Sequence, residues 1–428
     1  MRPFAFLTLL VMLFVSSVAS AQDAPTDTFI FALIMTRHGV RSFTHTLPNY
    51  TWPDWSPVDP GFLSEHGYRL MTYMGEFYRN YFAERGLSMG CNTEGTYVYA
   101  DRDQRTLETA RALIEGACGH PDALPMYHLP NLAPNVNDPL FSGAQAFAPD
   151  KVDPEASRAA VIAALPVPPS ALVSQHAGEF AALQTLLDRR CSGTCPRADS
   201  GDYTVVARRN MYEYSGPIVA GSDYAEDLFL ESAQCEPDID PQDIEQAMQL
   251  HVAEYDVNAR NAYSPWVRAG NIFAHAIAMI DEKAGKHTIG IESPDLSRTK
   301  VAIFSGHDTQ VGAFGGMLGV RWKTADGLAP DDTPPGGALV FELFRNKQGA
   351  YFVRVEFASQ SMAQYRKDSE LDGGAVMTTV GTYPLAHLET LAQKAVSMGF
   401  VQKTWVKASS APVDLAPLHD PSWTKCDP

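Results

Sequence analysis

The chain has few basic residues. Among its 428 residues are 33 lysines and arginines against 50 aspartates and glutamates, which gives a formal net charge of −17. Binding of nucleic acid through a basic surface is therefore excluded. Hydrophobic residues make up 45% of the sequence, enough for a sizeable core, so general disorder is excluded as well. If the protein binds an anion, a local group of arginines must attract it against the field of the whole molecule.

Several motifs of known chemistry are also missing. The sequence has no G-x-x-x-x-G-K-[ST] phosphate loop, no H-E-x-x-H zinc motif and no G-x-S-x-G nucleophile elbow. Nothing in the sequence requires a metal ion or a nucleotide cofactor, and we expect neither. After the N-terminal segment, no apolar run is long enough to span a membrane.

The N-terminal segment has the pattern of a secretory signal peptide. Arg2 supplies a positive charge, residues 4–15 are almost all apolar, and Ala19-Ser20-Ala21 matches a cleavage site. We expect residues 1–21 to be removed and the protein to be periplasmic or secreted, with no membrane association afterwards. The sequence does not indicate an oligomeric state.

The cysteine content fits an exported protein. An even number of cysteines in such a chain predicts disulfides, and six cysteines allow 15 pairings. Cys91 and Cys118 flank one strand–helix unit, and Cys191 and Cys195 could close a small loop, but the sequence alone does not choose the pairing. The other two cysteines are Cys235 and Cys426.

Three short apolar segments each lead directly into a polar motif. Residues 28–35 precede Arg37-His38-Gly39-Val40-Arg41, residues 96–100 precede Asp101-Arg102-Asp103-Gln104-Arg105, and residues 301–304 precede Ser305-Gly306-His307-Asp308-Thr309. Continuous apolar runs of this length are typical of strands buried on both faces of a sheet. Because ligands of open α/β sheets bind beyond the carboxyl ends of the strands, we expect the three motifs to meet in one crevice.

The remaining pattern predicts an α/β fold with an insertion. Helices are expected over residues 64–85 and 105–117, and residues 339–344 and 351–357 are expected to form a hairpin. Residues 149–286 show helical periods and few strand runs. We therefore predict a central mixed sheet flanked by helices on both faces, formed by residues 22–148 and 287–428. Residues 149–286 would form a smaller, mostly helical domain that caps the active site.

Arg37-His38-Gly39-x-Arg41 is the most specific motif. Arginine is suited to bidentate binding of phosphate, and two arginines four positions apart can hold one group from two sides. A neutral histidine between them suits nucleophilic attack on phosphorus, and Gly39 would let the backbone approach the ligand. Surface arginines beside a capping histidine would not explain a polar cluster placed directly after a buried strand.

The other two motifs complete this picture. His307 beside Asp308 fits an imidazole that binds phosphate next to an acid that protonates the leaving oxygen. Asp308 could equally cap a helix, which is compatible with that role. Asp101 and Asp103 would by themselves be taken as helix capping, and Arg105 gains weight because the other strand ends already offer phosphate ligands. We expect His251, on an apolar helix face, to be a packing residue.

The motifs resemble those of the histidine acid phosphatases. Arg37-His38-Gly39-Val40-Arg41-x-x-Thr44 with His307-Asp308 matches the family pattern. Trp52-Pro53-x-Trp55, Gly61-Phe62-Leu63-Ser64 and Thr333-Pro334-Pro335-Gly336-Gly337 are similar to segments of its bacterial phytases and glucose-1-phosphatases. The resemblance implies a sheet flanked by helices with a small helical domain above the site, and metal-independent hydrolysis of phosphomonoesters at acid pH.

The resemblance also implies a role for each site residue. His38 would be the nucleophile that becomes a phosphohistidine, and Asp308 would protonate the leaving oxygen. The phosphoryl oxygens would be held by Arg37, Arg41, Arg105 and His307. The substrate pocket would be lined by Thr44, Asp101, Glu226 and Thr309.

The resemblance implies a small phosphomonoester as the substrate, and Thr309, the residue expected after His-Asp in phytases, favours inositol hexakisphosphate. Two departures from the family pattern, Gln310 and Asp223, concern the substrate and leave a broad acid phosphatase or a glucose-1-phosphatase-like enzyme open. A phosphomutase is disfavoured by export, since its substrates are cytosolic. A phosphate-ester binding protein without catalysis would not need Asp308.

Overall fold

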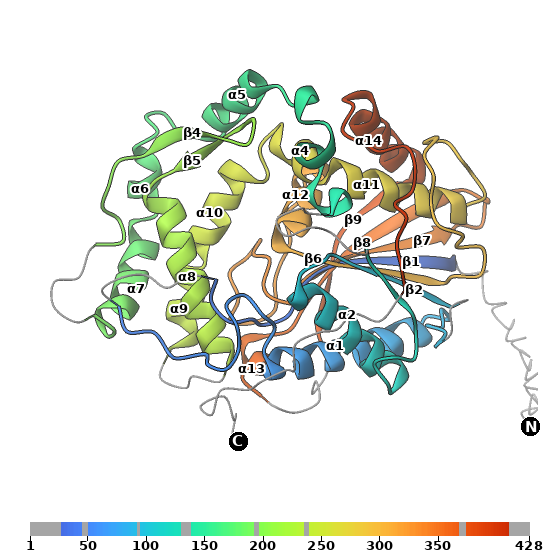
Figure 1. Ribbon diagram of the computed structural model, residues 1–428, viewed down its shortest axis with the longest axis horizontal. Coiled ribbons are helices and arrows are strands. Elements are labelled where there is room, and N and C mark those ends of the chain that lie inside the picture. Colours follow the sequence, from blue (N-terminus) through green and yellow to red (C-terminus); the bar gives the residue numbers. More distant parts are fainter. Residues whose placement is uncertain are drawn as a thin grey trace, which may run out of the picture.

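The protein is described from a computed structural model, over residues 27–44, 50–91, 95–129, 138–191, 197–234, 239–367 and 374–410. Its centre is a seven-stranded mixed sheet of order β3-β2-β6-β1-β7-β8-β9 (Figure 1). Strands β3, β2, β6 and β1 are parallel, and the other three are antiparallel. The strands span Thr28–Arg37 (β1), Thr96–Ala100 (β2), Met126–Tyr127 (β3), Val301–Gly306 (β6), Ala338–Arg345 (β7), Tyr351–Ser359 (β8) and Val376–Pro384 (β9).

The three strands that precede the polar motifs are neighbours and end at the same level. β6 lies between β1 and β2, with Arg37 paired to Gly306 and Ala100 paired to Ser305. The next residues along the three strands are His38, His307 and Asp101, so the register itself brings them to one edge of the sheet. This topology brings the three motifs together at one edge of the sheet, as the sequence predicts.

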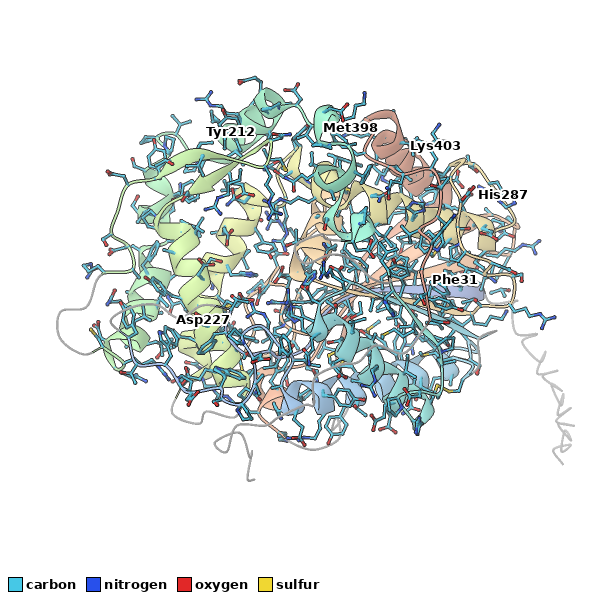
Figure 2. All side chains as sticks on the ribbon, viewed as in Figure 1. Phe31, Tyr212, Asp227, His287, Met398 and Lys403 are labelled. Carbon is cyan, nitrogen blue, oxygen red and sulfur yellow. A yellow bond between two sulfur atoms is a disulfide. The ribbon has the colours of Figure 1, made fainter. Side chains whose placement is uncertain are left out.

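The apolar run of β1 is continuous because both of its faces are covered. Phe31, Leu33 and Met35 belong to one hydrophobic cluster, and Ala32 and Ile34 belong to another on the opposite face. All five side chains are fully buried, and Phe31 is labelled within the sheet in Figure 2. This alternation is the usual consequence of helices lying on both faces of a sheet.

Helices cover each face of the sheet. The face of Ala32 and Ile34 is covered by α1 (Glu65–Ala83) and α2 (Gln104–Cys118). The other face is covered by α3 (Pro139–Ser142), α4 (Ala144–Phe147), α11 (Ser264–Lys283), α12 (Asp308–Leu318) and α14 (Leu385–Ser397). The predicted sheet flanked by helices on both faces is therefore confirmed (Figure 1).

A second group of elements has its own apolar cluster beside the sheet. It contains α5 (Pro154–Ala164), α6 (Ala171–Gln175), α7 (Ala177–Asp188), α8 (Pro217–Ala233), α9 (Pro241–Ala247) and α10 (Gln249–Asn258). A two-stranded hairpin of β4 (Thr204–Arg208) and β5 (Met211–Ser215) lies against them. The short helix η1 (Pro149–Lys151) precedes this group in sequence, and α13 (Met362–Tyr365) follows it but adds Met362 and Tyr365 to the same cluster. This group is called the cap below.

The distribution of apolar clusters supports a cap smaller than the expected residues 149–286. Helix α11 lies within that range, but its buried side chains from Trp266 to Ile280 belong to the cluster of the sheet. Within residues 149–286, the last residue of the cluster of the cap is Val257. We therefore propose that the cap ends near the end of α10. A helical period cannot distinguish these cases, because it shows which face is apolar and not which partner that face meets.

The secondary structure at the motifs agrees with the sequence. β2 has the predicted bounds, and the helix that begins at Glu65 is capped by the Ser64 hydroxyl, which accepts from the backbone N–H of Gly67. Cys91 and Cys118 form a disulfide, and Cys191 is also disulfide-bonded. The predicted signal peptide, Cys195, Cys235 and Cys426 lie outside the described residues. Within the described ranges, every helix is too short or too polar to cross a membrane.

Candidate active site

His38 lies at the end of β1 with its reactive nitrogen defined by a backbone contact. The residue is 2% exposed, and its backbone N–H donates to the carbonyl of Gly306 on β6 at 2.9 Å. The His38 Nδ1 lies 2.9 Å from the carbonyl oxygen of Gly39. Since a carbonyl only accepts, Nδ1 must carry the hydrogen in this contact, and Nε2 of the neutral ring keeps its lone pair.

The surroundings of His38 keep its ring neutral. Burial, followed by the positive charges of Arg105 and Arg37, lowers the pKa of His38 well below its usual value. The His307 ring lies edge-on to it, with ring centroids 5.5 Å apart. A histidine that stays neutral at acid pH with a free Nε2 is a competent nucleophile.

Arg37 is fully buried at the centre of a network of charges. Its Nη1 donates to the carbonyl of Thr333 at 2.6 Å. Its Nη2 bonds to Glu226 and lies 3.0 Å from Asp308 Oδ2. Burial opposes the charge on the guanidinium, but the two carboxylates outweigh it and raise the pKa of Arg37.

Glu226, on α8 of the cap, joins the two arginines of the first motif. One carboxylate oxygen bonds to Arg37 and the other lies 3.3 Å from Nη2 of Arg41. Burial would raise the pKa of Glu226, but Arg37 and Arg41 outweigh it and lower the pKa. The carboxylate is therefore an anion that lies against the two guanidiniums expected to hold a phosphoryl group.

Asp308 begins helix α12, and its carboxylate is held by the next residue. Its Oδ1 accepts from the backbone N–H of Thr309 at 2.6 Å and from the Thr309 hydroxyl at 3.2 Å. Burial would raise the pKa of Asp308, but Arg37 and then His251 lower it well below its usual range. In this state of the protein Asp308 is an anion, so it can act as an acid only if substrate binding raises its pKa.

Asp101, Arg105 and His307 form the opposite wall of the site. The His307 Nε2 lies 2.9 Å from Asp101 Oδ2, and its Nδ1 lies 3.4 Å from Nη2 of Arg105. Asp103 Oδ2 lies 2.6 Å from the same Arg105 nitrogen. Asp101 is thus placed to orient the His307 ring, and Asp103 to orient Arg105, which is more than the helix capping that their sequence pattern suggested.

The outer residues of the predicted set lie around this centre. Thr309 lines a cavity together with Asp101 and His307. Thr44 is exposed, and its methyl group and Arg105 Nη1 lie 3.3 Å and 3.7 Å from the place that a Cβ on Gly61 would take. The fold therefore places all ten predicted site residues in one region, from both the sheet and the cap.

Packing against α1 already requires a glycine at position 39. A Cβ at this position would lie 2.7 Å from Met71 Cγ and 3.0 Å from the carbonyl oxygen of Gly67, both on α1. At Gly67, in turn, a Cβ would lie 2.1 Å from the carbonyl oxygen of Val40. These two glycines let α1 cross directly over the motif, and no approach to a ligand is needed to explain Gly39.

Sequence reasoning missed the residues behind this centre. His251, on α10, is 4% exposed and its Nδ1 lies 2.8 Å from Asp332 Oδ1. Burial would lower the pKa of His251, but the hydrogen bond to Asp332 raises it. Burial and the Asp308 carboxylate raise the pKa of Tyr255, one helical turn further along, well above its usual value. The only sequence signal is the position of His251 on an apolar helix face, which by itself predicts packing.

Glu226, His251 and Asp308 also have the composition of a metal site. One ligand atom from each lies within 4.8 Å of the others. Arg37, however, bonds to both carboxylates from within the same cluster, and the His251 Nδ1 is engaged by Asp332. A cation among these donors would have to displace a buried guanidinium, so the cluster fits an ion-pair network better than a metal centre.

Comparison with known proteins gives several relatives over most of the chain. The phytase AppA of Escherichia coli (strain K12) is 27% identical over 394 residues, which cover 86% of this chain and 88% of that protein. A glucose-1-phosphatase of Salmonella typhimurium is 26% identical over 385 residues, which cover 83% and 87%. No protein-family model matches the chain.

Solved structures agree with these relatives. The phytase of Hafnia alvei in complex with myo-inositol hexakis sulphate superposes with a TM-score of 0.74 at 27% identity, covering 87% of this chain and 98% of that one. The phytase of Citrobacter braakii, at 22% identity, has the same fold with a TM-score of 0.70. The chain thus resembles the bacterial phytases and glucose-1-phosphatases of the histidine acid phosphatases over most of its length, as its motifs predict.

Proposed function

We propose that the protein hydrolyses phosphomonoesters at acid pH, without a metal ion, through a phosphohistidine formed on His38. The observation that carries this proposal is a buried neutral histidine whose Nε2 has no hydrogen-bond partner among the described residues, surrounded by side chains suited to binding phosphate. These side chains are Arg37, Arg41, Arg105 and His307. The similarity to phytases and glucose-1-phosphatases supports the same reaction class.

In the first step, His38 Nε2 attacks phosphorus and the bond between phosphorus and the ester oxygen breaks. The arginines neutralise the negative charge on the equatorial oxygens. Stabilisation of this charge is the main source of catalysis when phosphoryl transfer passes through a loose transition state. Asp308 supplies a proton to the leaving oxygen. A bound phosphate dianion raises the pKa of Asp308, because it adds negative charge nearby and competes for Arg37.

In the second step, water attacks the phosphohistidine and Asp308, now an anion, accepts the proton from that water. The bond between phosphorus and His38 Nε2 breaks, and inorganic phosphate leaves. His251 and Tyr255 do not touch the reacting atoms in this scheme. They hold Asp308 and its ion-pair network in place.

For the substrate we propose inositol hexakisphosphate, with a glucose-1-phosphatase-like sugar-phosphate hydrolase as the alternative. The phytase relatives and the Hafnia alvei complex with an inositol hexakis sulphate support the first. The glucose-1-phosphatase relatives support the second. We also propose that the protein acts in the periplasm or is secreted, on the basis of the signal-peptide pattern in residues 1–21.

Phosphate release from inositol hexakisphosphate at acid pH tests this proposal, with 4-nitrophenyl phosphate as a simple ester and the His38→Ala protein as the blank. We expect the wild type to release phosphate from both esters and His38→Ala to lose nearly all turnover while it stays folded by circular dichroism. Turnover at the wild-type level in His38→Ala would refute the phosphohistidine. Release from 4-nitrophenyl phosphate alone would favour a broad acid phosphatase or the sugar-phosphate alternative.

The role of Asp308 is tested by the leaving group. 4-Nitrophenolate departs without protonation, whereas an inositol or sugar oxygen needs a proton. Asp308→Asn should therefore lower kcat on inositol hexakisphosphate by about 100-fold or more, the usual contribution of general acid catalysis, and lower kcat on 4-nitrophenyl phosphate much less. Equal losses on the two esters would count against Asp308 as the proton donor.

A further inference from the structure

A cavity of about 260 Å³ opens beside the catalytic centre. It shares Asp101, His307 and Thr309 with the site described above, and three arginines also line it: Arg102, Arg209 and Arg268. They come from separate parts of the chain, namely the segment after β2, the tip of the β4–β5 hairpin and helix α11. A ligand in this cavity would lie between the sheet and the cap.

The charges around the cavity favour an anion. The acids that line it are Asp101 and Asp103, and they are engaged with His307 and Arg105. Arg268 is paired with Glu213. Arg209 forms no ion pair with the residues that the structure describes, so its charge is available to a ligand. Because the whole chain has a net charge of −17, these arginines form a local positive region on an otherwise negative protein.

The hairpin tip is held firmly in place. The Asn210 side chain donates to the carbonyl of Pro149 at 3.3 Å, and the Ser157 hydroxyl on α5 accepts from the backbone N–H of Tyr212 at 2.9 Å. Further along β5, the side chain of Asn258 on α10 bonds to both backbone groups of Tyr214. Tyr212 is labelled in this hairpin in Figure 2. Arg209 is therefore presented from a fixed support and not from a free loop.

The backbone of Arg209 is itself unusual. Its φ is 47° and that of Asn210 is 65°, which is the left-handed region that two-residue hairpin turns require and that glycine or asparagine normally occupies. A long cationic side chain at such a position is unfavourable for the turn. Conformations of this kind persist where the surrounding structure fixes them, and they cluster at ligand-binding sites; the side chain of Arg209 lines the cavity.

We propose that Arg102 and Arg209 form a second anion subsite, which binds a phosphate group of the substrate other than the one that His38 attacks. The inference rests on the proposed function and specifies its substrate class, namely esters that carry two or more phosphates. When the transferred phosphoryl group lies on Arg37, Arg41 and Arg105, the leaving oxygen faces Asp308. The rest of the substrate then extends past Thr309 into the cavity.

The test compares kcat/KM for inositol hexakisphosphate with kcat/KM for 4-nitrophenyl phosphate. The variants are Arg209→Gln, Arg102→Gln and, as the control, Arg158→Gln, which removes the same charge from an exposed position on α5 outside the cavity lining. Each of the first two should lower the ratio of the two values by about tenfold, as expected when one hydrogen bond to a charged group is lost. Arg158→Gln should leave the ratio within twofold of the wild type.

A second readout does not depend on turnover. Binding of myo-inositol hexakis sulphate, measured by titration calorimetry, should weaken about tenfold in Arg209→Gln, while binding of inorganic phosphate should be the same as in the wild type. Added salt should weaken hexakis sulphate binding more in the wild type than in the variant, because fewer charges are screened in the variant.

The possible outcomes distinguish a failure of the subsite proposal from a failure of the proposed function. If the wild type hydrolyses neither ester, the proposed function fails and hexakis sulphate binding alone decides on the subsite. If the wild type hydrolyses 4-nitrophenyl phosphate but the ratio is unchanged in Arg209→Gln and Arg102→Gln, the function stands and the subsite is wrong. Equal losses on both esters would likewise overturn the subsite, because a general structural effect of the substitution would then explain the result.

Discussion

We expect Asp227 to make the stability of the protein depend on pH. It lies on α8 directly after Glu226, is labelled in Figure 2, is 3% exposed, and its Oδ2 has no hydrogen-bond partner in the described part of the chain. Burial and the charge of Glu226 raise the pKa of Asp227 to about 8. An aspartate in an unfolded chain has a pKa of about 3.9. The folded protein therefore keeps this proton over most of the acid range.

The sign and the size of the effect follow from these two values. Below about pH 3.9 both states hold the proton, and the group has no effect on stability. Between about pH 3.9 and the folded-state pKa, the native state binds one proton more than the unfolded state. The free energy of unfolding then falls by about 1.4 kcal/mol for each unit that the pH rises. From about pH 4.5 to about pH 6.5 the loss is about 2.7 kcal/mol.

Asp227→Asn should abolish this loss, because the amide is neutral at every pH. In equilibrium urea unfolding, we expect the variant to gain about 2.7 kcal/mol relative to the wild type when the pH is raised from about 4.5 to about 6.5. Asp202→Asn, an exposed position with the same change of charge, is the control. A constant difference between Asp227→Asn and the wild type at the two pH values would refute a protonated Asp227.

Two further predictions concern the phosphate pocket and the disulfide. Glu226→Gln should lower the inhibition constant for inorganic phosphate by about tenfold, since a neutral side chain no longer competes for Arg37 and Arg41; inhibition assays that give an unchanged or larger constant would contradict this. Replacing Cys91 and Cys118 by serine opens a loop of 27 residues and should lower the free energy of unfolding by about 3 kcal/mol. Urea titration measures this, and equal stability would contradict it.

The sequence predicts well the part of the site that lies at the strand ends, because short local patterns place these residues. Each of Arg37, Arg105 and Asp308 stands within a few positions of a buried strand, so a short apolar run followed by polar residues specifies where its side chain must be. Parallel pairing of neighbouring strands then brings the three strand ends to one edge. No knowledge of the helices is required for this step.

The cap side could not be predicted in the same way. His251 belongs to an amphipathic helix, and the period of a helix does not say whether the facing partner is a core or a cluster of charges. Its partner Asp332 is 81 positions away in a segment without regular structure. Arg209 gave no sequence signal at all, because its role depends on the left-handed turn and on the anchors of the hairpin. Glu226 was found only through the resemblance to known phosphatases.

The position of β6 in the sheet means that the active site is completed only late in the synthesis of the chain. β6 lies between β1 and β2 although it follows both of them, and the whole cap, in the chain. A nascent chain that carries the complete Arg37-His38-Gly39 motif thus has no phosphate pocket, since His307 and Asp308 are missing and the strand that joins the two walls has not been made. Any fragment that ends before residue 301 should be inactive however well it folds. Hydrolytic activity is for this reason a stringent reporter of the complete, correctly threaded sheet.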